Sequence, residues 1–423
     1  MGGMGEIKLK TVFRDKILRA DHNNLLGSLP EDIYNATKLE EFALPLNSLN
    51  GAISERIANL ANLTILDFYF NHLSGVIPIN FGKLSKLKFM NFDFNSLEGS
   101  LPPSLIRCTN LLEIHLGFNY LEGDLTTLNF SKLSHLSKLD LVGNNFTGIL
   151  LISLYSCKSL KAIRLSGNCY LEGKIHSEIL SLESLSFLSL AHARLTNITG
   201  TMKILMGCKS LHTFFLIGSF DREAMPTDDG IVDFHSFQNL FFLSLVKCGL
   251  ASQIPDWLSN LKNLEILFLG NNQITGSIPS WLGTLPKLFY VDLSLNQISG
   301  EFPKELCRLP MLQVLMPTIL AVALTRHKVV NEKIVEKPGV AIWDSYNFKG
   351  FPYVFQSKNY GRVQTENPQL LPWICRWDTN LNPSHPKLNS SHFSQQSVLV
   401  QQITSTEEEK KVPYWNVMFN DVQ

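Results

Sequence analysis

The chain has 423 residues, and its 37 lysine and arginine residues balance its 37 aspartate and glutamate residues, so the formal net charge is zero. A neutral chain gives no electrostatic reason to expect nucleic acid or an anionic membrane surface as a partner. Hydrophobic residues make up 45% of the sequence and charged residues 17%, which fits a chain that is mostly folded rather than a disordered one.

The sequence shows no targeting signal and no membrane span. Its first residues, MGGMGEIKLK, lack the apolar run of a secretory signal. The most apolar stretch, residues 309–324, is interrupted by Pro310, Gln313 and Pro317, so we expect a buried or amphipathic segment there. We therefore expect contact with a membrane only through segments that this chain lacks.

A repeat of about 24 residues organises most of the sequence. Its clearest marker is an asparagine that is followed by a glycine four or five residues later, as in Asn71 and Gly75. The nine asparagines of this series are Asn23, Asn47, Asn71, Asn95, Asn119, Asn144, Asn168, Asn272 and Asn296. Residues 264–287, LEILFLGNNQITGSIPSWLGTLPK, show the complete unit: leucines alternate before the asparagine, and Ile-Pro follows the glycine.

Each part of the unit has a structural role. The alternating leucines predict a short strand whose leucines face the core and whose other residues face outward. The asparagine side chain can bond backbone groups of its own coil and of the next, so a column of asparagines satisfies buried polar groups. One repeat cannot bury its leucines alone, and stacking supplies the core. We therefore predict an α/β solenoid of about twelve repeats, with a parallel sheet on the concave face and short helical or 3-10 turns on the convex side.

Three repeats in the middle of the chain lack the asparagine. Ala193, Ser219 and Cys248 stand in its place. A cysteine can act as a weak donor in such a ladder, whereas an alanine cannot. We therefore expect these three coils to be the least regular.

The repeat pattern also defines the expected domains. Residues 1–17 form an N-terminal segment without a recognisable cap, and residues 18–315 form the solenoid. Residues 316–423 show no repeat and become rich in polar residues, so we expect an unassigned, partly disordered tail.

Motifs for catalysis are absent from the sequence. It contains no phosphate-binding glycine loop, no zinc-binding histidine motif and no kinase signature. The eleven histidines are scattered, and no cysteine–histidine cluster has metal-ligand spacing. We therefore expect a protein that is not an enzyme and that has no catalytic residues, cofactor or metal ligands. Candidate N-glycosylation sites are Asn35, Asn62, Asn129, Asn145, Asn197 and Asn389.

The outward residues of the strands line up in columns on the concave face. The column directly before the ladder asparagine contains Phe70, Phe94 and Phe118, and the column two residues before it contains Tyr69 and Asp93. A third column, four residues before the asparagine, contains Asp67, Asn91, His115, Asp140 and Arg164. Farther along, the concave face carries Phe215, Phe242, Phe268, Tyr290 and Asp292.

These columns suit the recognition of an extended peptide. Neighbouring strands lie about 4.8 Å apart, so the phenylalanines would form a strip of stacked rings. Apolar anchors with a polar rim are typical of protein interfaces. The alternative is that the phenylalanines only pack against the neighbouring coil. We expect ligand contacts from Asp67, Tyr69, Phe70, Asp93, Phe94, His115, Phe118 and Arg164.

Residues 18–312 resemble the ectodomains of plant leucine-rich-repeat receptors, because the unit has the form LxxLxLxxNxLxGxIPxxLxxLxx, the plant extracellular variant of this repeat. Residues 233–312 most closely resemble the receptors for tyrosine-sulfated peptides. The resemblance implies a plasma-membrane or extracellular protein that binds a peptide or protein on its inner curve and signals through a kinase domain or a co-receptor kinase. The caps, the island between late repeats, the membrane span and the kinase of such receptors are not visible here.

The leading hypothesis is a non-catalytic recognition module for cell-surface signalling or defence. One alternative is a truncated receptor product. A second is an intracellular leucine-rich-repeat scaffold that uses the same surface for protein–protein interaction. A third, an independent activity in the tail, has no catalytic constellation to support it.

Overall fold

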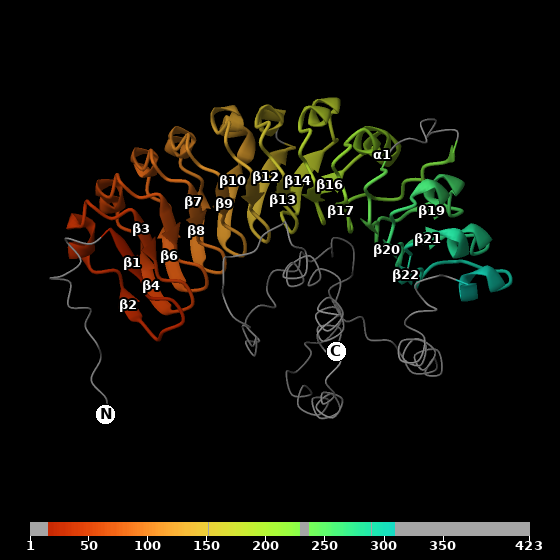
Figure 1. Cartoon of the computed structure of the whole chain (residues 1–423), viewed down its shortest axis with the longest axis horizontal. Helices are drawn as coiled ribbons and strands as arrows, with labels where there is room; N and C mark the ends of the chain where they lie inside the picture. The colour runs from red at the N-terminus through yellow and green to blue at the C-terminus, as the bar shows by residue number, and fades with distance from the viewer. Residues whose placement is uncertain (1–15, 151, 229–236, 289, 309–423) are drawn as a thin grey trace, which may run out of the picture.

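The computed structural model describes residues 16–150, 152–228, 237–288 and 290–308. Within these residues the chain winds into a curved stack of coils, with strands along the inner curve and short helices along the outer curve (Figure 1). The predicted solenoid with a parallel sheet on its concave face is therefore confirmed. The expected solenoid boundary at residue 315 and the expected tail lie outside the described residues.

Twelve parallel strands form the inner sheet, and they follow one another in chain order, which agrees with the expected number of repeats. Each strand pairs with the next without a register shift, as when Leu66 lies opposite Met90. The strands are β1 (Ile17–Arg19), β3 (Glu41–Ala43), β5 (Ile65–Asp67), β7 (Phe89–Asn91), β9 (Glu113–His115), β11 (Lys138–Asp140), β13 (Ala162–Arg164), β15 (Phe187–Ser189), β17 (Thr213–Phe215), β18 (Phe242–Ser244), β20 (Ile266–Phe268) and β22 (Tyr290–Asp292).

The repeat pattern does not predict a second parallel sheet, whose strands come just after the ladder positions in the sequence. Its eight strands are β2 (Leu26–Ser28), β4 (Ser48–Ala52), β6 (His72–Val76), β8 (Ser96–Ser100), β10 (Tyr120–Asp124), β12 (Asn145–Ile149), β14 (Tyr170–Gly173) and β16 (Arg194–Leu195). Two further strands, β19 (Ala251–Ser252) and β21 (Gln273–Ile274), pair with each other. Repeat glycines lie in strands of the eight-stranded sheet, as Gly75 does in β6: it has a φ of 71°, and a Cβ there would lie 3.2 Å from the Ala52 Cβ.

Short 3-10 helices occupy the outer curve. They are η2 (Glu31–Asn35), η3 (Glu55–Asn59), η4 (Phe81–Lys83), η5 (Pro103–Arg107), η6 (Leu125–Thr127), η7 (Phe130–Lys132), η8 (Ile152–Ser156), η9 (Ser177–Ser181), η11 (Asp256–Asn260), η12 (Ser280–Thr284) and η13 (Lys304–Arg308). One α-helix, α1 (Ile198–Met206), replaces the 3-10 turn in its coil. In the described part of the chain, no helix is both long enough and apolar enough to cross a bilayer.

The hydrophobic core runs without interruption through the stack, between the inner sheet and the outer helices. Leucines of the repeat are fully buried in this core; examples are Leu66 and Leu73 of the third coil. Aromatic side chains link adjacent coils inside the core: the rings of Phe42 and Phe68 have centroids 4.9 Å apart. Each coil therefore buries its apolar residues against two neighbours, as a solenoid requires.

The asparagine ladder joins each coil to the preceding one. Asn119 is fully buried, and its Nδ2 donates to the carbonyls of Leu116 and Gly117 in its own coil at 3.1 Å. The same Nδ2 donates to the carbonyl of Phe92 in the preceding coil at 2.9 Å, and Oδ1 accepts the Leu97 amide at 3.0 Å. One side chain thus satisfies four buried backbone groups, which confirms the role expected for the ladder.

The residues that replace the ladder asparagine in three coils differ in whether their side chains bond the preceding coil. The Ser219 hydroxyl donates to the carbonyl of Leu190 at 2.8 Å, and the Cys248 thiol donates to that of Leu216 at 2.9 Å. Ala193 is buried and has no side-chain donor. Serine and cysteine therefore keep the contact with the preceding coil, whereas the alanine coil loses it, as the sequence predicts.

We expect Asn119→Ala to lower the free energy of unfolding by about 2–4 kcal/mol, because several buried backbone groups lose their partner at once. Urea denaturation of the full chain, followed by circular dichroism, measures this loss. Asn50→Ala is the matched control, since Asn50 is exposed in β4. Equal urea midpoints for the two variants would contradict the role of the ladder.

Candidate functional site

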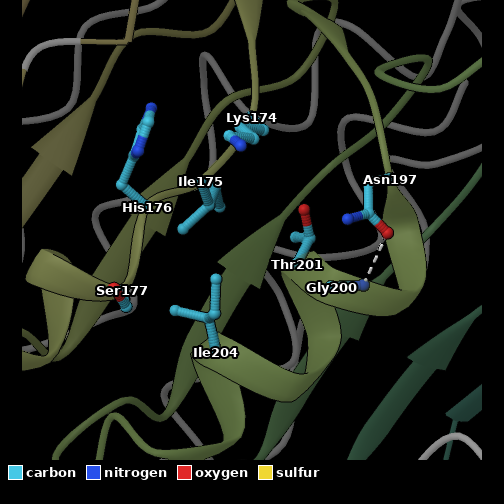
Figure 2. Close-up of a pocket in the computed structure, with 8 residues that line it drawn as sticks. All are labelled: Lys174, Ile175, His176, Ser177, Asn197, Gly200, Thr201 and Ile204. Carbon is cyan, nitrogen blue, oxygen red and sulfur yellow. Dashed lines mark hydrogen bonds between the residues drawn. The ribbon is translucent and has the colours of Figure 1, made fainter.

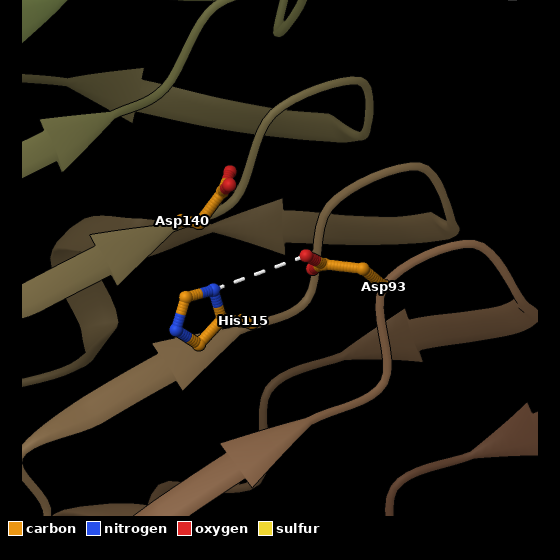
Figure 3. Close-up of side chains that lie close together, drawn as sticks. All are labelled: Asp93, His115 and Asp140. Atoms are coloured by element: carbon orange, nitrogen blue, oxygen red, sulfur yellow. Dashed lines mark ion pairs between the residues drawn. The ribbon is translucent and has the colours of Figure 1, made fainter. Parts of the chain in front are cut away.

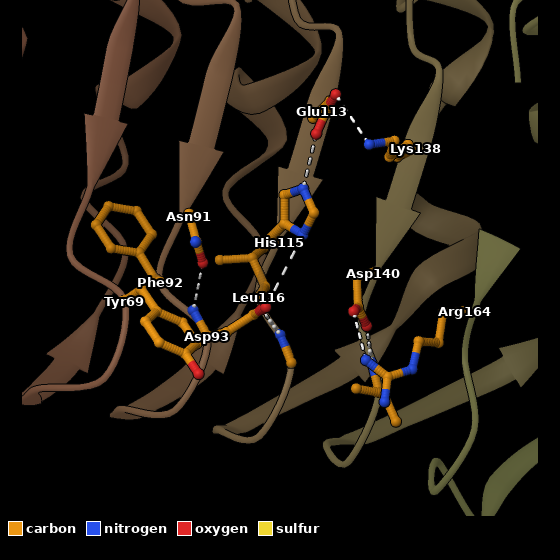
Figure 4. A network of polar contacts seen from close by, with 12 residues as sticks. Tyr69, Asn91, Phe92, Asp93, Glu113, His115, Leu116, Lys138, Asp140 and Arg164 are labelled. Carbon is orange, nitrogen blue, oxygen red and sulfur yellow. Dashed lines mark hydrogen bonds and ion pairs between the residues drawn. The ribbon is translucent and has the colours of Figure 1, made fainter. Parts of the chain in front are cut away.

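The predicted ligand residues lie on neighbouring coils, from β5 to β13 of the inner sheet. β5, β7, β9, β11 and β13 each end on one residue of the third column, and these residues are Asp67, Asn91, His115, Asp140 and Arg164. Because the strands pair in register, Asn91 lies opposite His115, which lies opposite Asp140. The unshifted register therefore brings polar residues from separate coils side by side (Figure 4).

Four aromatic side chains follow β5, β7 and β9, and we call Tyr69, Phe70, Phe94 and Phe118 the aromatic strip. The rings of Phe94 and Phe118 stack with centroids 4.3 Å apart. Tyr69 meets Phe94 edge-on at 5.7 Å, and Phe70 lies 5.9 Å from Phe94. Phe118 is buried, whereas the other three keep part of their surface exposed. Packing against the neighbouring coil therefore accounts for Phe118 and only partly for the rest of the strip.

The residue before each ladder asparagine adopts a left-handed backbone conformation. The φ angles are 52° at Phe70, 56° at Phe94 and 54° at Phe118. For a residue with a side chain this conformation costs about 1 kcal/mol or more. Two neighbouring coils, at Gly143 and Gly167, use glycine at the same position. Those two glycines were the sequence signal for this turn, which the column pattern alone did not predict.

Residues at the end of the inner strands stabilise the turn that follows. Asp67 Oδ1 accepts the Tyr69 amide at 3.1 Å, and Asp140 Oδ1 accepts the Val142 amide at 3.0 Å. Asn91 makes the equivalent bond. These are Asx turns, in which a short polar side chain bonds the backbone two residues later. The recurrence of Asp and Asn in the third column therefore has a structural cause, and Asp67, which is buried, holds its own turn.

His115 cannot form this turn, and Asp93 of the preceding coil replaces the missing bond. Asp93 Oδ1 accepts the Gly117 amide at 2.6 Å. A Cβ at Gly117 would lie 3.3 Å from oxygens of both Asp93 and Asp140, so the glycine leaves room between the two carboxyl groups. Asp93, His115 and Asp140 each offer one ligand atom within 4.8 Å of the others (Figure 3). We call these three residues the Asp–His–Asp cluster.

Charged neighbours surround this cluster. His115 Nε2 lies 3.2 Å from Glu113 Oε2, and Lys138 Nζ lies 3.2 Å from Glu113 Oε1. On the other side, Arg164 donates to Asp140 Oδ2 at 2.8 Å. The side chains form one polar network across three strands, as Figure 4 shows. Glu113 and Lys138 were not among the predicted site residues, although both occupy the outward position two residues before the third column.

The network changes the titration of its members. Burial raises the pKa of Asp93, and the negative charge of Asp140 raises it further. Burial alone would lower the pKa of His115, but the hydrogen bond to Glu113 and the negative charges of Asp93 and Asp140 outweigh it, so the pKa of His115 is raised. Both groups therefore tend to hold a proton, which reduces the negative charge of the network.

Farther along the inner sheet, outward-facing aromatic residues pack from coil to coil. The ring centroids of Phe215 and Phe242 lie 4.5 Å apart, and those of Phe268 and Tyr290 lie 5.0 Å apart. Phe215 and Phe242 belong to a hydrophobic cluster that is separate from the main core, and Phe268 and Tyr290 pack against it. The concave face thus has a mixed polar and aromatic part over the early coils and an apolar part over the later ones.

The candidate glycosylation sites within the described residues lie at the surface. Asn62 is half-exposed, and the exposed ones are Asn35, Asn129, Asn145 and Asn197. Asn389 lies outside the described residues.

A pocket of about 210 Å³ lies between η9 and α1 (Figure 2). It is lined by Lys174, Ile175, His176, Ser177, Asn197, Gly200, Thr201 and Ile204. At the N-terminus of α1, the carboxylate of Glu223 accepts the amides of Asn197 and Ile198 at 2.8 and 2.7 Å. A carboxylate of this chain therefore fills the position that an anionic ligand would take, and we assign no ligand to this pocket.

Comparison with known proteins finds similarity to leucine-rich-repeat proteins. Two family models, both described as leucine rich repeat, match the chain: one covers residues 238–298, the other residues 62–84 and 135–157. Receptor-like protein 3 of Arabidopsis thaliana is 42% identical over 95 residues, which are 22% of this chain and 13% of that protein. Phytosulfokine receptor 1 of the same plant is 38% identical over 92 residues, 22% of this chain and 9% of the receptor. The chain spans about a tenth of the length of these relatives.

The fold also resembles solved receptor ectodomains. The ectodomain of the Arabidopsis receptor kinase HAESA, solved in complex with an IDA peptide hormone ligand, superposes with a TM-score of 0.56 at 30% sequence identity. The superposition covers 68% of this chain and 47% of that one.

Asp93→Asn tests the titration of the network. A carboxyl group whose pKa is raised on folding stabilises the fold below its unfolded pKa, and this stability is lost as the pH rises through the folded pKa. Because asparagine stays neutral and keeps the acceptor for Gly117, we expect the variant to gain at least about 1 kcal/mol over the wild type near pH 8.5, and less near pH 5.5.

Thermal unfolding of the full chain at both pH values measures this difference. Asp32→Asn in η2 is the control, because Asp32 is exposed and lies outside the network. A constant difference between wild type and Asp93→Asn at the two pH values would show that Asp93 does not titrate as described.

Proposed function

We propose that this chain is a member of the plant leucine-rich-repeat receptor family and is a non-catalytic module that binds a peptide or protein ligand on its concave face. The observation that carries the proposal is the aromatic strip. Tyr69, Phe70 and Phe94 keep part of their surface exposed next to the half-buried carboxyl group of Asp93. Apolar rings beside a polar group are the usual composition of an interface centre.

The dimensions of the strip suit an extended segment. Successive coils lie about 4.8 Å apart, and an extended chain advances about 3.3 Å per residue, so two or three side chains of a bound peptide can reach the strip. Aromatic residues supply much contact area at a small cost in conformational entropy. We therefore expect a ligand that places an apolar or aromatic side chain against Tyr69 and Phe94.

The eight predicted residues divide by role under this proposal. Tyr69, Phe70, Asp93 and Phe94 retain exposed surface and would contact the ligand. The other four support them: Asp67 holds the Tyr69 turn, and Phe118 stacks on Phe94. His115 and Arg164 are buried, and both bond carboxylates of the network.

The relatives favour a peptide over other ligand classes. HAESA, which shares the fold at 30% identity, holds a peptide hormone ligand in its solved complex. Phytosulfokine receptor 1 matches in sequence as well. We therefore propose a role in cell-surface signalling or defence, at the plasma membrane or outside it, with a co-receptor kinase as a second partner.

A double substitution, Tyr69→Ala with Phe94→Ala, tests the contact role of the strip. The probe is a synthetic peptide, obtained by selecting a phage-displayed library of short linear peptides on the immobilised full chain. Loss of two aromatic anchors should weaken its binding at least about tenfold, since each anchor contributes about 1 kcal/mol or more. Isothermal titration calorimetry measures the two dissociation constants.

Tyr170→Ala is the control for this experiment, because Tyr170 is exposed on β14 in the second sheet, away from the strip. It should leave the affinity unchanged. If the selected peptides lose affinity through Tyr170→Ala and not through the double substitution, ligands bind another face and the proposal is wrong.

A further inference from the structure

The Asp–His–Asp cluster combines side chains that metal ions prefer as ligands. β9 and β11 deliver His115 and Asp140, and the turn after β7 delivers Asp93 (Figure 3). One ligand atom of each residue lies within 4.8 Å of the other two. We propose that Asp93, His115 and Asp140 bind a divalent transition-metal ion on the concave face. This proposal does not depend on peptide binding.

The histidine is oriented as in known metal sites. Its Nε2 faces Glu113 at 3.2 Å, while its Nδ1 faces Asp93 Oδ2 at 3.9 Å. A metal-bound histidine usually donates its second ring N–H to a carboxylate, which fixes the tautomer and leaves the other nitrogen for the ion. Lys138 pairs with Glu113 and so holds this carboxylate in place. Nδ1 is therefore the nitrogen that points into the cluster.

A side chain at position 117 would crowd the two carboxyl groups. Gly117 lies between the two carboxyl groups, and a Cβ there would come within 3.3 Å of an oxygen of each. The same Cβ would lie 2.7 Å from the Val142 Cγ1. Ligands at about 2.0–2.2 Å from an ion are about 3 Å apart, so small side-chain rotations would bring the three residues into coordination.

Arg164 does not prevent coordination by Asp140. Each carboxylate oxygen has two lone pairs, so Oδ2 can accept from Arg164 while another lone pair faces the ion. Carboxylates that bind metal ions are commonly hydrogen-bonded in this way. Asp93 is different, because its ion-pair partner within the described residues is His115. A cation would compensate the repulsion between Asp93 and Asp140.

The chemical types of the three ligands indicate which ions the cluster would bind. One imidazole and two carboxylates suit Zn²⁺ or Mn²⁺, whereas Ca²⁺ and Mg²⁺ favour sites built from oxygen alone. Three protein ligands leave at least one position for water. Competing thiolates are not expected from the described free cysteines, because burial raises the pKa of each; they are Cys108, Cys157, Cys208 and Cys248.

The test is titration of the untagged, chelator-treated full chain with ZnCl₂ and with MnCl₂ by isothermal calorimetry. We expect one ion per chain, with an affinity that rises with pH because the ion displaces protons from the cluster. His115→Ala should weaken binding at least about tenfold, and Glu113→Gln should weaken it less, since Glu113 only positions the imidazole.

Two further variants keep the test decisive. Asp93→Asn removes a ligand but retains the acceptor for the Gly117 amide, so it reports on the site even if His115→Ala fails to fold. His72→Ala is the matched control, because His72 is exposed on β6 in the second sheet. Absence of saturable binding to the wild type, or equal affinity in wild type, Asp93→Asn and His115→Ala, would overturn the proposal.

Discussion

The asparagine ladder is the interaction on which the rest of this structure depends. From Asn47 onward, each ladder asparagine bonds the backbone of its own coil and of the preceding one, as Asn119 does with Leu116 and Phe92. Because these groups are buried, an unbonded coil would leave several backbone groups unsatisfied. The ladder therefore sets the rotation of each coil relative to the last, and the hydrophobic core then fills the space inside.

A fixed rotation of the coils creates both the aromatic strip and the Asp–His–Asp cluster. Since the inner strands pair without a register shift, residues at equal positions of successive coils become spatial neighbours. Phe94 and Phe118 therefore stack, and Asp93, His115 and Asp140 converge although they are distant in sequence. The same regularity brings like charges together, and the network of Glu113, Lys138 and Arg164 surrounds them.

The fold could be predicted from the sequence because the residues that produce it recur at a regular spacing. The leucine pattern and the asparagines recur in most coils, so one irregular coil, such as that of Ala193, does not obscure them. The second sheet was not predicted, because its strands lack an alternating apolar pattern: β6 and β8 share only a leucine and the repeat glycine, and their other residues differ. Their strand pairing follows from the stacking of coils and not from a local pattern.

The site could be predicted only in part. Counting residues back from the ladder placed Tyr69, Asp93 and His115 on the concave face. Counting could not show that Asp67 serves its own turn, because that depends on a backbone conformation which the residue types alone do not specify. The cluster was also missed: it draws residues from two different columns, and it needs the space that Gly117 leaves between them.

Amide hydrogen exchange of the full chain tests the central claim, that the asparagine side chains hold the coils together. The amides that bond ladder oxygens, those of Leu49, Leu73, Leu97 and Leu121, should exchange orders of magnitude more slowly than an unstructured chain. Their protection should be similar in all four coils. Exchange of these amides at the rate of an unstructured chain would contradict the account.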